Sequence, residues 1–323
     1  NSLRLVGGVR YEDTDQESTG TRFNAPEGSF ETSTGSNDYD NVLPSLNARY
    51  ELTPDTLIRA SYFRSIARPI FEQLAPSIII EDDDEVEFGN PDLDPAEADS
   101  LGLGIEHYFS DTSAVSAHLF YKDIDDLVFQ ADLAGTGQTR RGLDLDEFSE
   151  AETFDNAEGG EILGIELAGS HQFSDLPGMW RGLFVNGNVA LSDSEATISG
   201  FNSTTGDSEQ RDIDLPRQSD VTANLSLGYE YGGLSTRLAG SFKSEHLLEL
   251  GDPLDETGDI YEDDHFQLDL SSKYNITEQF LVTFEAINLN DREFFAFQNE
   301  EAFNAQFEEY GRTFRLGLAY TMF

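Results

Sequence analysis

The chain ends in the stretch YGRTFRLGLAYTMF, residues 310–323, and this stretch carries the pattern that decides the fold. Large apolar residues alternate there with small or charged ones. One face of the expected strand carries Phe314, Leu316, Leu318, Tyr320 and Met322, and the other carries Arg315, Gly317, Ala319 and Thr321. Such a period of two is typical of a β-strand with one covered face. A bare apolar edge invites aggregation, so we expect something to cover this strand.

The composition excludes several classes of protein. The 323 residues include 63 acidic and 19 basic ones, for a net charge of −44, and no cysteine. Nucleic-acid binding needs clustered Lys and Arg, so we expect no nucleic-acid partner. Disulfides and thiol chemistry are excluded as well. Low hydrophobicity with high charge favours disorder, but 24 Phe and 12 Tyr argue against it. No apolar run approaches the ~18 residues of a membrane helix.

The alternating pattern recurs along the whole chain and predicts about 12 strands, most of them ~8–12 residues long, a length that suits a tilted strand crossing a bilayer. The connections alternate in length. Short ones lie at 53–55, 110–113, 174–182, 232–233 and 275–279, and long ones cover roughly 13–41, 65–98, 125–160, 193–219, 244–264 and 290–310. Short turns at one end and long loops at the other are typical of a transmembrane barrel. We therefore predict an all-β, antiparallel transmembrane β-barrel.

The two faces of the predicted strands differ as a barrel requires. Leu, Val, Ile, Phe and Tyr share one face, whereas small residues and charges of both signs share the other. Because lipid would penalise charges, we expect those charges to face a polar lumen. They are Arg49, Arg59, Glu106, Glu166, Arg237, Asp269, Glu285 and Arg315.

Several stretches resemble the C-terminal barrel of TonB-dependent outer-membrane receptors. They are FRSIARPIFEQLAP (63–76), GNPDLDPAEADSLGLGIEHYF (89–109), FEAINLNDREF (284–294) and the terminal strand. The resemblance implies a barrel of about 22 strands around a plug. Residues 1–323 are then expected to be the C-terminal portion of that barrel, without the plug and the first strands. A complete barrel of 12 strands is the alternative.

The resemblance also implies partners and a location. A TonB-dependent receptor would lie in the outer membrane of a Gram-negative bacterium, in contact with lipid, and would engage the TonB complex through the missing plug. Its closing strand would be read by the barrel-assembly machinery, which assigns that role here to Tyr320 and Phe323. The family's usual aromatic at the third-last position is replaced by Thr321, a departure from the pattern. If strands are missing, Leu3 to Tyr11 and Phe314 to Tyr320 are expected to present unpaired edges.

Candidate ligand-binding residues come from the long connections. We predict substrate contacts for Arg68, Phe71, Glu72, Phe294, Phe295 and Phe297. Packing over the barrel mouth is the competing interpretation for the Phe-rich segment 292–307. Clustered carboxylates at Asp82, Asp83 and Asp84 suggest Ca²⁺ weakly, because no EF-hand loop accompanies them, and solvated outer loops explain the same acidity. No cofactor or bound metal is expected.

The predicted function is active import of a small nutrient with energy from the TonB system. Because an acidic mouth repels anions, a carbohydrate or other neutral ligand is favoured over a ferric siderophore. A passive 12-stranded channel is the alternative. An enzyme is not expected, since the five His are scattered and no Gly-x-Ser-x-Gly elbow is present.

The predicted topology can be tested in intact cells. Protease sites or tags inserted within 81–99 and 251–264 should be reached from outside, because long loops of outer-membrane barrels are extracellular. Insertions at Pro54 and Gly233 should be reached only after the cells are opened. Accessibility in the reverse order would show that the topology is inverted.

Overall fold

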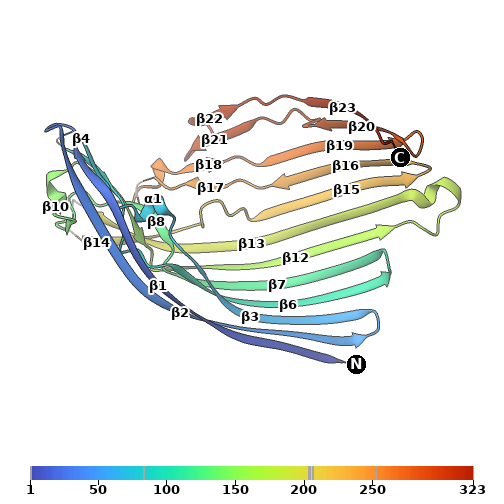
Figure 1. Ribbon diagram of the computed structural model, residues 1–323, viewed down its shortest axis with the longest axis horizontal. Coiled ribbons are helices and arrows are strands. Elements are labelled where there is room, and N and C mark those ends of the chain that lie inside the picture. Colours follow the sequence, from blue (N-terminus) through green and yellow to red (C-terminus); the bar gives the residue numbers. More distant parts are fainter. Residues whose placement is uncertain (1, 83, 203–204, 206, 252, 323) are drawn as a thin grey trace.

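The computed structural model describes residues 2–82, 84–202, 205, 207–251 and 253–322. Within them, twelve long strands pair in chain order through eleven antiparallel ladders and form one curved wall (Figure 1). The wall strands are β1 (Leu3–Asn24), β2 (Ser29–Thr53), β3 (Thr56–Ala67), β6 (Ala96–Ser110), β7 (Ser113–Asp125), β12 (Gly159–Gln172), β13 (Leu183–Asn202), β15 (Val221–Tyr231), β16 (Leu234–Lys243), β19 (His265–Asn275), β20 (Phe280–Ile287) and β23 (Thr313–Tyr320). The predicted all-β, antiparallel fold is confirmed.

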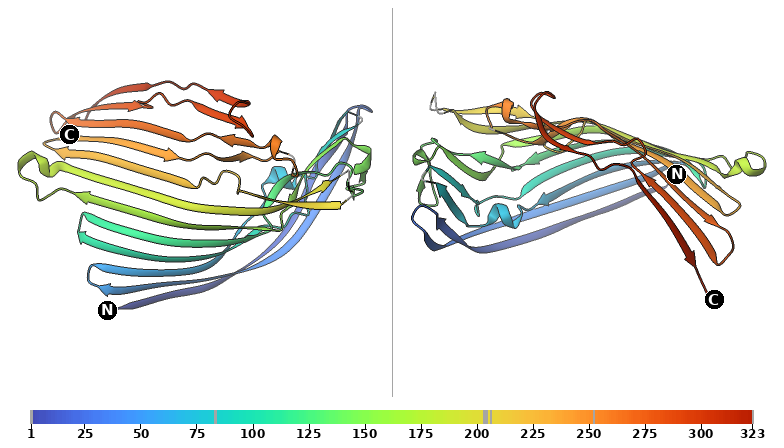
Figure 2. Two further views of the ribbon diagram at one scale, coloured as in Figure 1. Left: turned by 180° about the vertical axis from the view of Figure 1, so that it is seen from behind. Right: turned by 90° about the horizontal axis from the view of Figure 1, so that it is seen from above.

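The wall is bent into an open trough with β1 and β23 at its two edges (Figure 2). Among the described residues, β1 pairs with β2 and β4, and β23 pairs with β20, so the two edge strands do not pair with each other. Short turns join the strands at one end of the trough, and the connecting segments gather at the other end, as predicted (Figure 1). No helix in the described part of the chain is long and apolar enough to cross a membrane.

The connections at 13–41 and 193–219, predicted as long loops, are largely strand. β1 and β2 stay paired from Leu3↔Tyr50 as far as Asn24↔Ser29, and β13 continues against β14 (Asp207–Ile213). Hydropathy missed the β1–β2 extension because both of its faces are rich in Ser, Thr, Asp and Glu. It missed the β13–β14 hairpin because only a few apolar residues, among them Ala196, Ile198 and Ile213, mark the face that packs in a core. A strand needs an apolar face only where it lies against lipid or a core, and these hairpins extend beyond the apolar band.

The remaining connections build smaller sheets at the long-connection end. One is β4 (Ile78–Asp82), β5 (Glu85–Phe88), β11 (Glu150–Asn156) and β8 (Val128–Asp132), joined edge to edge and attached to β1. Another is β17 (His246–Glu249), β18 (Ile260–Glu262), β21 (Phe294–Gln298) and β22 (Asn304–Glu308). The short elements are α1 (Phe71–Leu74), η1 (Leu145–Glu147), η2 (Gly178–Gly182), η3 (Glu256–Gly258), β9 (Thr139–Arg140) and β10 (Leu143–Asp144).

Two apolar cores lie among these connections rather than inside the wall. The first core, in which β4, β5 and β11 meet the 143–145 segment, consists of Ile78, Ile80, Val86, Phe88, Leu143, Leu145 and Ala151. The second packs around the β13–β14 hairpin and contains Ala157, Ala196, Ile198, Ile213, Leu215 and Leu247. The wall itself is a single sheet, so each core stabilises the connections and leaves the wall's apolar face uncovered.

Within the described ranges, connecting segments cover only the polar face of the wall. The Asn37 amide donates to the Leu93 carbonyl at 3.0 Å, and the Leu215 backbone N–H donates to Ser194 Oγ at 3.3 Å. Ser100 on this face is 4% exposed, whereas its neighbour Leu101 on the apolar face is 54% exposed. The polar face is therefore the one on which the loops fold, as expected for a lumen.

Labels on the two faces test this assignment. Because lipid should cover the apolar face, spin labels at Leu103, Ile165 and Leu225 should be quenched by a lipid-soluble relaxation agent. Labels at Glu106, Glu166 and Arg237 should respond instead to a water-soluble one. Equal access of the water-soluble agent to both sets would contradict a membrane-spanning wall.

Candidate ligand-binding site

The short helix α1 lies at the long-connection end of the wall, where it forms the edge of a pocket. Ile70 precedes it, and the Ile70 N–H donates to the Gln73 side chain at 2.9 Å, which fixes the first turn. Phe71 is 93% exposed, so its ring projects into solvent. Arg68 lies nearby but is engaged, since its guanidinium pairs with Glu12 and donates to Thr14 Oγ1 at 3.4 Å. Of these sequence candidates, Phe71 and Glu72 are the ones presented freely to a ligand.

Glu72 opens onto a pocket of about 200 Å³ between α1 and the sheet β4–β5–β11–β8. Its polar lining comes from Glu72, Glu87, Gln130 and Glu152. The aromatic residue Phe154 also lines it, whereas the side chain of Phe88 is buried in the first apolar core. The volume is below the ~300–1,000 Å³ of most drug-sized ligand sites, so the pocket suits one small group of a ligand.

The sheet register concentrates negative charge in this pocket. Glu87 in β5 lies opposite Glu152 in β11, and Glu152 lies opposite Asp132 in β8. Like charges directly opposite on neighbouring strands repel. Burial, followed by the nearby Glu150, Glu87 and Asp132 carboxylates, raises the pKa of Glu152 above its usual range. Because burial and the neighbouring carboxylates make the charged form of Glu152 unfavourable, a cation or a hydrogen-bond donor beside it would be stabilising.

The Phe-rich segment is more ordered than a loop and lies in another place. Phe294, Phe295 and Phe297 belong to β21. Phe297 is 3% exposed and stacks on Tyr261, with ring centroids 5.9 Å apart. Packing therefore describes Phe297 in this structure, while Phe294 and Phe295 are half-buried and do not line the Glu72 pocket.

The two Asn-containing stretches that carried the resemblance, 89–109 and 284–294, use their Asn side chains to bind backbone groups of neighbouring segments. Asn90 donates from its amide to the Phe154 carbonyl at 2.9 Å and accepts the Asp92 N–H at 3.1 Å. Asn290 donates to the Phe266 carbonyl and accepts the Leu268 N–H at 2.9 Å, replacing a ladder partner where β20 ends. These contacts position the connections over the polar face. Their signal in sequence is the turn chemistry of Asn and Asp, which compete well for backbone groups.

The predicted lumen charges share the polar face, and four of the eight form ion pairs with one another. Arg59 and Glu106 lie 2.5 Å apart, and Arg315 and Glu285 lie 3.6 Å apart. The remaining contacts are Arg49 with Glu51 at 3.3 Å, Arg237 over the Phe184 ring at 5.7 Å, Asp269 accepting from the Asn288 N–H at 2.8 Å, and Glu166 beside a polar groove that Lys122 also lines.

The remaining predicted sites are placed only in part. The side chain of Asp82, all of Asp83 and all of Phe323 lie outside the described residues. Asp84 accepts the Ser149 N–H at 2.8 Å through its carbonyl. Within the described ranges, no three His, Asp or Glu side chains are grouped to hold a metal ion. Tyr320 ends β23 and is exposed on the apolar face opposite Phe280.

These features define a class of protein: an antiparallel β-wall with one apolar face, one polar, loop-covered face, and an acidic pocket at the long-connection end. Comparison with known proteins agrees. A family model described as "TonB dependent receptor-like, beta-barrel" matches residues 1–289. The chain therefore belongs to the TonB-dependent receptor β-barrel family, which is found in the outer membrane of Gram-negative bacteria and consists of transporters rather than enzymes.

Solved structures share the fold at low sequence identity. The copper transporter OprC aligns with a TM-score of 0.67 and 15% identity over 98% of this chain and 45% of its own. The ferric-catecholate import receptor Fiu from Escherichia coli K12 gives 0.67 and 16% over 98% and 42%. The ferric yersiniabactin uptake receptor FyuA from Yersinia pestis gives 0.64 and 20% over 99% and 43%. The chain thus spans less than half the length of these relatives. No curated protein sequence matches.

The raised pKa of Glu152 generates a stability prediction. A carboxyl with a raised folded-state pKa binds its proton more tightly in the folded than in the unfolded protein, so the free energy of unfolding falls as pH rises through that range. Glu152→Gln should therefore raise the unfolding midpoint in detergent at neutral pH, and the gain should vanish at about pH 4. Glu147→Gln, at an exposed position in η1, is the control. It should leave the unfolding midpoint unchanged both at neutral pH and at about pH 4. A Glu152→Gln variant that is less stable at neutral pH would contradict the repulsion argument.

Proposed function

We propose that this chain forms part of an outer-membrane receptor that imports a small nutrient with energy from the TonB system. The family match over residues 1–289 carries this proposal. The solved relatives support it, because they are named as a transporter, an import receptor and an uptake receptor. The polar face covered by loops suits a passage that opens only when those loops move.

The acidic pocket supports a neutral or cationic ligand. Three carboxylates and the Gln130 amide can accept or donate hydrogen bonds, and Phe154 offers apolar surface. Hydroxyl groups of a carbohydrate or an ammonium or metal-bearing group would satisfy the Glu87–Glu152 pair, whereas a carboxylate or phosphate would add to the repulsion. The exposed Phe71 ring at the edge of the pocket supports stacking on a sugar or other flat group.

The relatives support a second ligand class. The names of these relatives include copper, a ferric catecholate and ferric yersiniabactin. A metal bound as a cation or in a neutral chelate is compatible with the pocket, and a strongly anionic chelate is the poorer electrostatic match. Ligand charge is thus the property that separates the candidates.

We also propose the partners that the family implies. The TonB complex would act through a plug domain, a small ligand would enter from the long-connection end, and the barrel-assembly machinery would read the closing strand at Tyr320 and Phe323. The exposed position of Tyr320 at the end of β23 supports the last of these.

Uptake measurements test the proposal. In a strain lacking the gene, the full gene product should restore uptake of a labelled neutral or cationic ligand identified by growth screening, and deletion of TonB should abolish that uptake. Glu87→Gln and Glu152→Gln should weaken ligand binding about tenfold, which corresponds to loss of one charge-assisted hydrogen bond of ~1.4 kcal/mol.

Asp111→Asn, in the short turn after β6, removes a charge far from the pocket and should leave uptake unchanged. Uptake that persists without TonB would favour a passive channel. Preferred uptake of an anionic chelate, unaffected by both Glu substitutions, would exclude the acidic pocket as the ligand site.

A further inference from the structure

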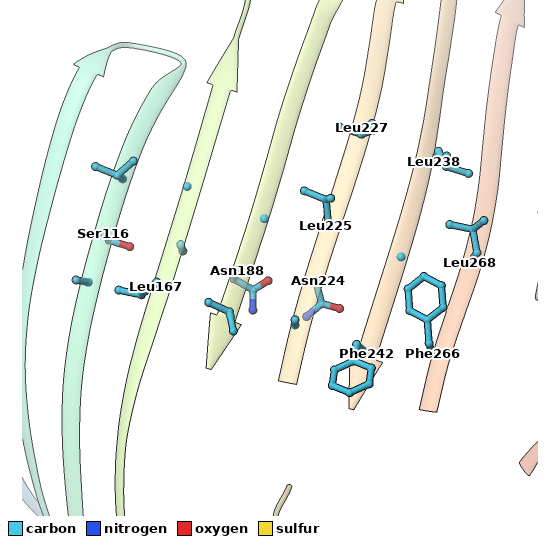
Figure 3. Close-up of a pocket in the computed structure, with 18 of the residues that line it drawn as sticks. Ser116, Leu167, Asn188, Asn224, Leu225, Leu227, Leu238, Phe242, Phe266 and Leu268 are labelled. Atoms are coloured by element: carbon cyan, nitrogen blue, oxygen red, sulfur yellow. The ribbon is translucent and has the colours of Figure 1, made fainter. Parts of the chain in front are cut away.

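The apolar face of the wall is not uniform, because it contains a groove of about 910 Å³ (Figure 3). The groove runs across seven neighbouring wall strands, from β6 to β19, and Leu167, Leu225, Leu227, Leu238 and Phe266 border it. These border side chains are between 37% and 54% exposed, so no other part of the described chain fills the space.

The floor of the groove is set by the strand register. Gly169 in β12 lies opposite Gly187 in β13, so two adjacent positions on the apolar face have no side chain. Ala117 and Ala223 lie in the neighbouring row. A Cβ added at Gly169 would meet only Val115 Cγ1 at 3.6 Å and the Ala114 carbonyl at 3.7 Å, both ordinary contacts. The backbone therefore does not require glycine at Gly169, and the missing side chain leaves real space there. At Gly187 a Cβ would lie 3.3 Å from Leu225 Cδ1, so the free space is centred on Gly169.

A second feature lies at the short-turn end of the same two strands. The β12–β13 connection contains η2, with Met179 and Trp180, the chain's single tryptophan, 56% and 59% exposed. Arg181 donates from Nε to the Gly178 carbonyl at 3.1 Å and makes no ion pair with the described residues. A Cβ on Gly182 would meet the Glu230 carbonyl at 2.4 Å, so η2 is seated closely against β15.

The groove and η2 are spaced as the two ends of a lipid. Gly187 is four residues beyond Leu183, where β13 begins, which corresponds to about 13 Å along the strand. Trp and Arg at a membrane–water boundary suit a headgroup region, and the guanidinium is a good donor to phosphate. In a chain of net charge −44, a cation presented at this boundary favours an anionic group.

We infer that the notch at Gly169 and Gly187 and the η2 turn together form a binding site for one phospholipid of the periplasmic leaflet. One acyl chain lies in the groove, and the phosphate is bound at Arg181 beside Trp180. The occupant follows from continuity with the lipid-covered wall, because the groove opens onto lipid along its whole length. The inference does not depend on the transported ligand.

Lipid retention tests this site. The full gene product, extracted from the outer membrane in a mild detergent and washed, should retain about one phospholipid per protein by native mass spectrometry. Gly169→Leu should reduce that retention about tenfold, because its side chain occupies the notch and removes apolar contact. Arg181→Gln should reduce it as well, and Ala223→Leu provides a second notch-filling variant should Gly169→Leu fail to fold.

Matched controls keep the test specific. Val282→Leu adds bulk on the same apolar face in β20, and Lys273→Gln removes a cation near the short-turn end of β19, and both should retain lipid as the unsubstituted protein does. Equal retention in the unsubstituted protein and both notch-filling variants would overturn the inference. Loss in the Val282→Leu control to the same extent, or a bound lipopolysaccharide in place of phospholipid, would overturn it too.

Discussion

The structure depends on one constraint: in lipid, each backbone N–H and C=O of the wall needs a partner from another strand. Eleven antiparallel ladders in chain order meet that need for the strands that lie between β1 and β23. Because the ladders fix the register, they also fix the faces, since a slip by one residue would turn every charge toward lipid. Neighbouring residues of β20 and β23 illustrate this. Glu285 pairs with Arg315 on the polar face, and Phe284 pairs with Leu316 on the apolar face.

The lipid-facing part of the fold could be predicted from sequence because lipid imposes a strict period of two. Leu101, Leu103 and Ile105 reveal the apolar face without any knowledge of their partners. The outer ends could not be predicted in this way. From about Glu12 to Asn41 both faces of the β1–β2 hairpin are polar, so no hydropathy signal separates strand from loop, and the pairing emerges only from the register.

The candidate site was predictable residue by residue but not as an arrangement. Glu72 was identified from its stretch, whereas Glu87 and Glu152 are 65 positions apart and meet because β5 and β11 pair in parallel. Nothing in either local sequence announces that pairing. The Phe-rich segment illustrates the reverse case: five Phe suggest a platform, but the β18–β21 pairing stacks Phe297 on Tyr261 instead. Long-range strand pairing is thus the information that local reading lacks.

The scarce basic residues explain where the acidity accumulates. Arg49, Arg59 and Arg315 are each paired with a carboxylate on the polar face of the wall. With 19 basic residues against 63 acidic ones, few cations remain for the outer connections. Water screens like charges at that end, so the chain tolerates Glu87 beside Glu152 there. Burial of Glu152 shows that screening is incomplete in the pocket, and this residual repulsion is the energy that a cation or a donor-rich ligand would relieve on binding.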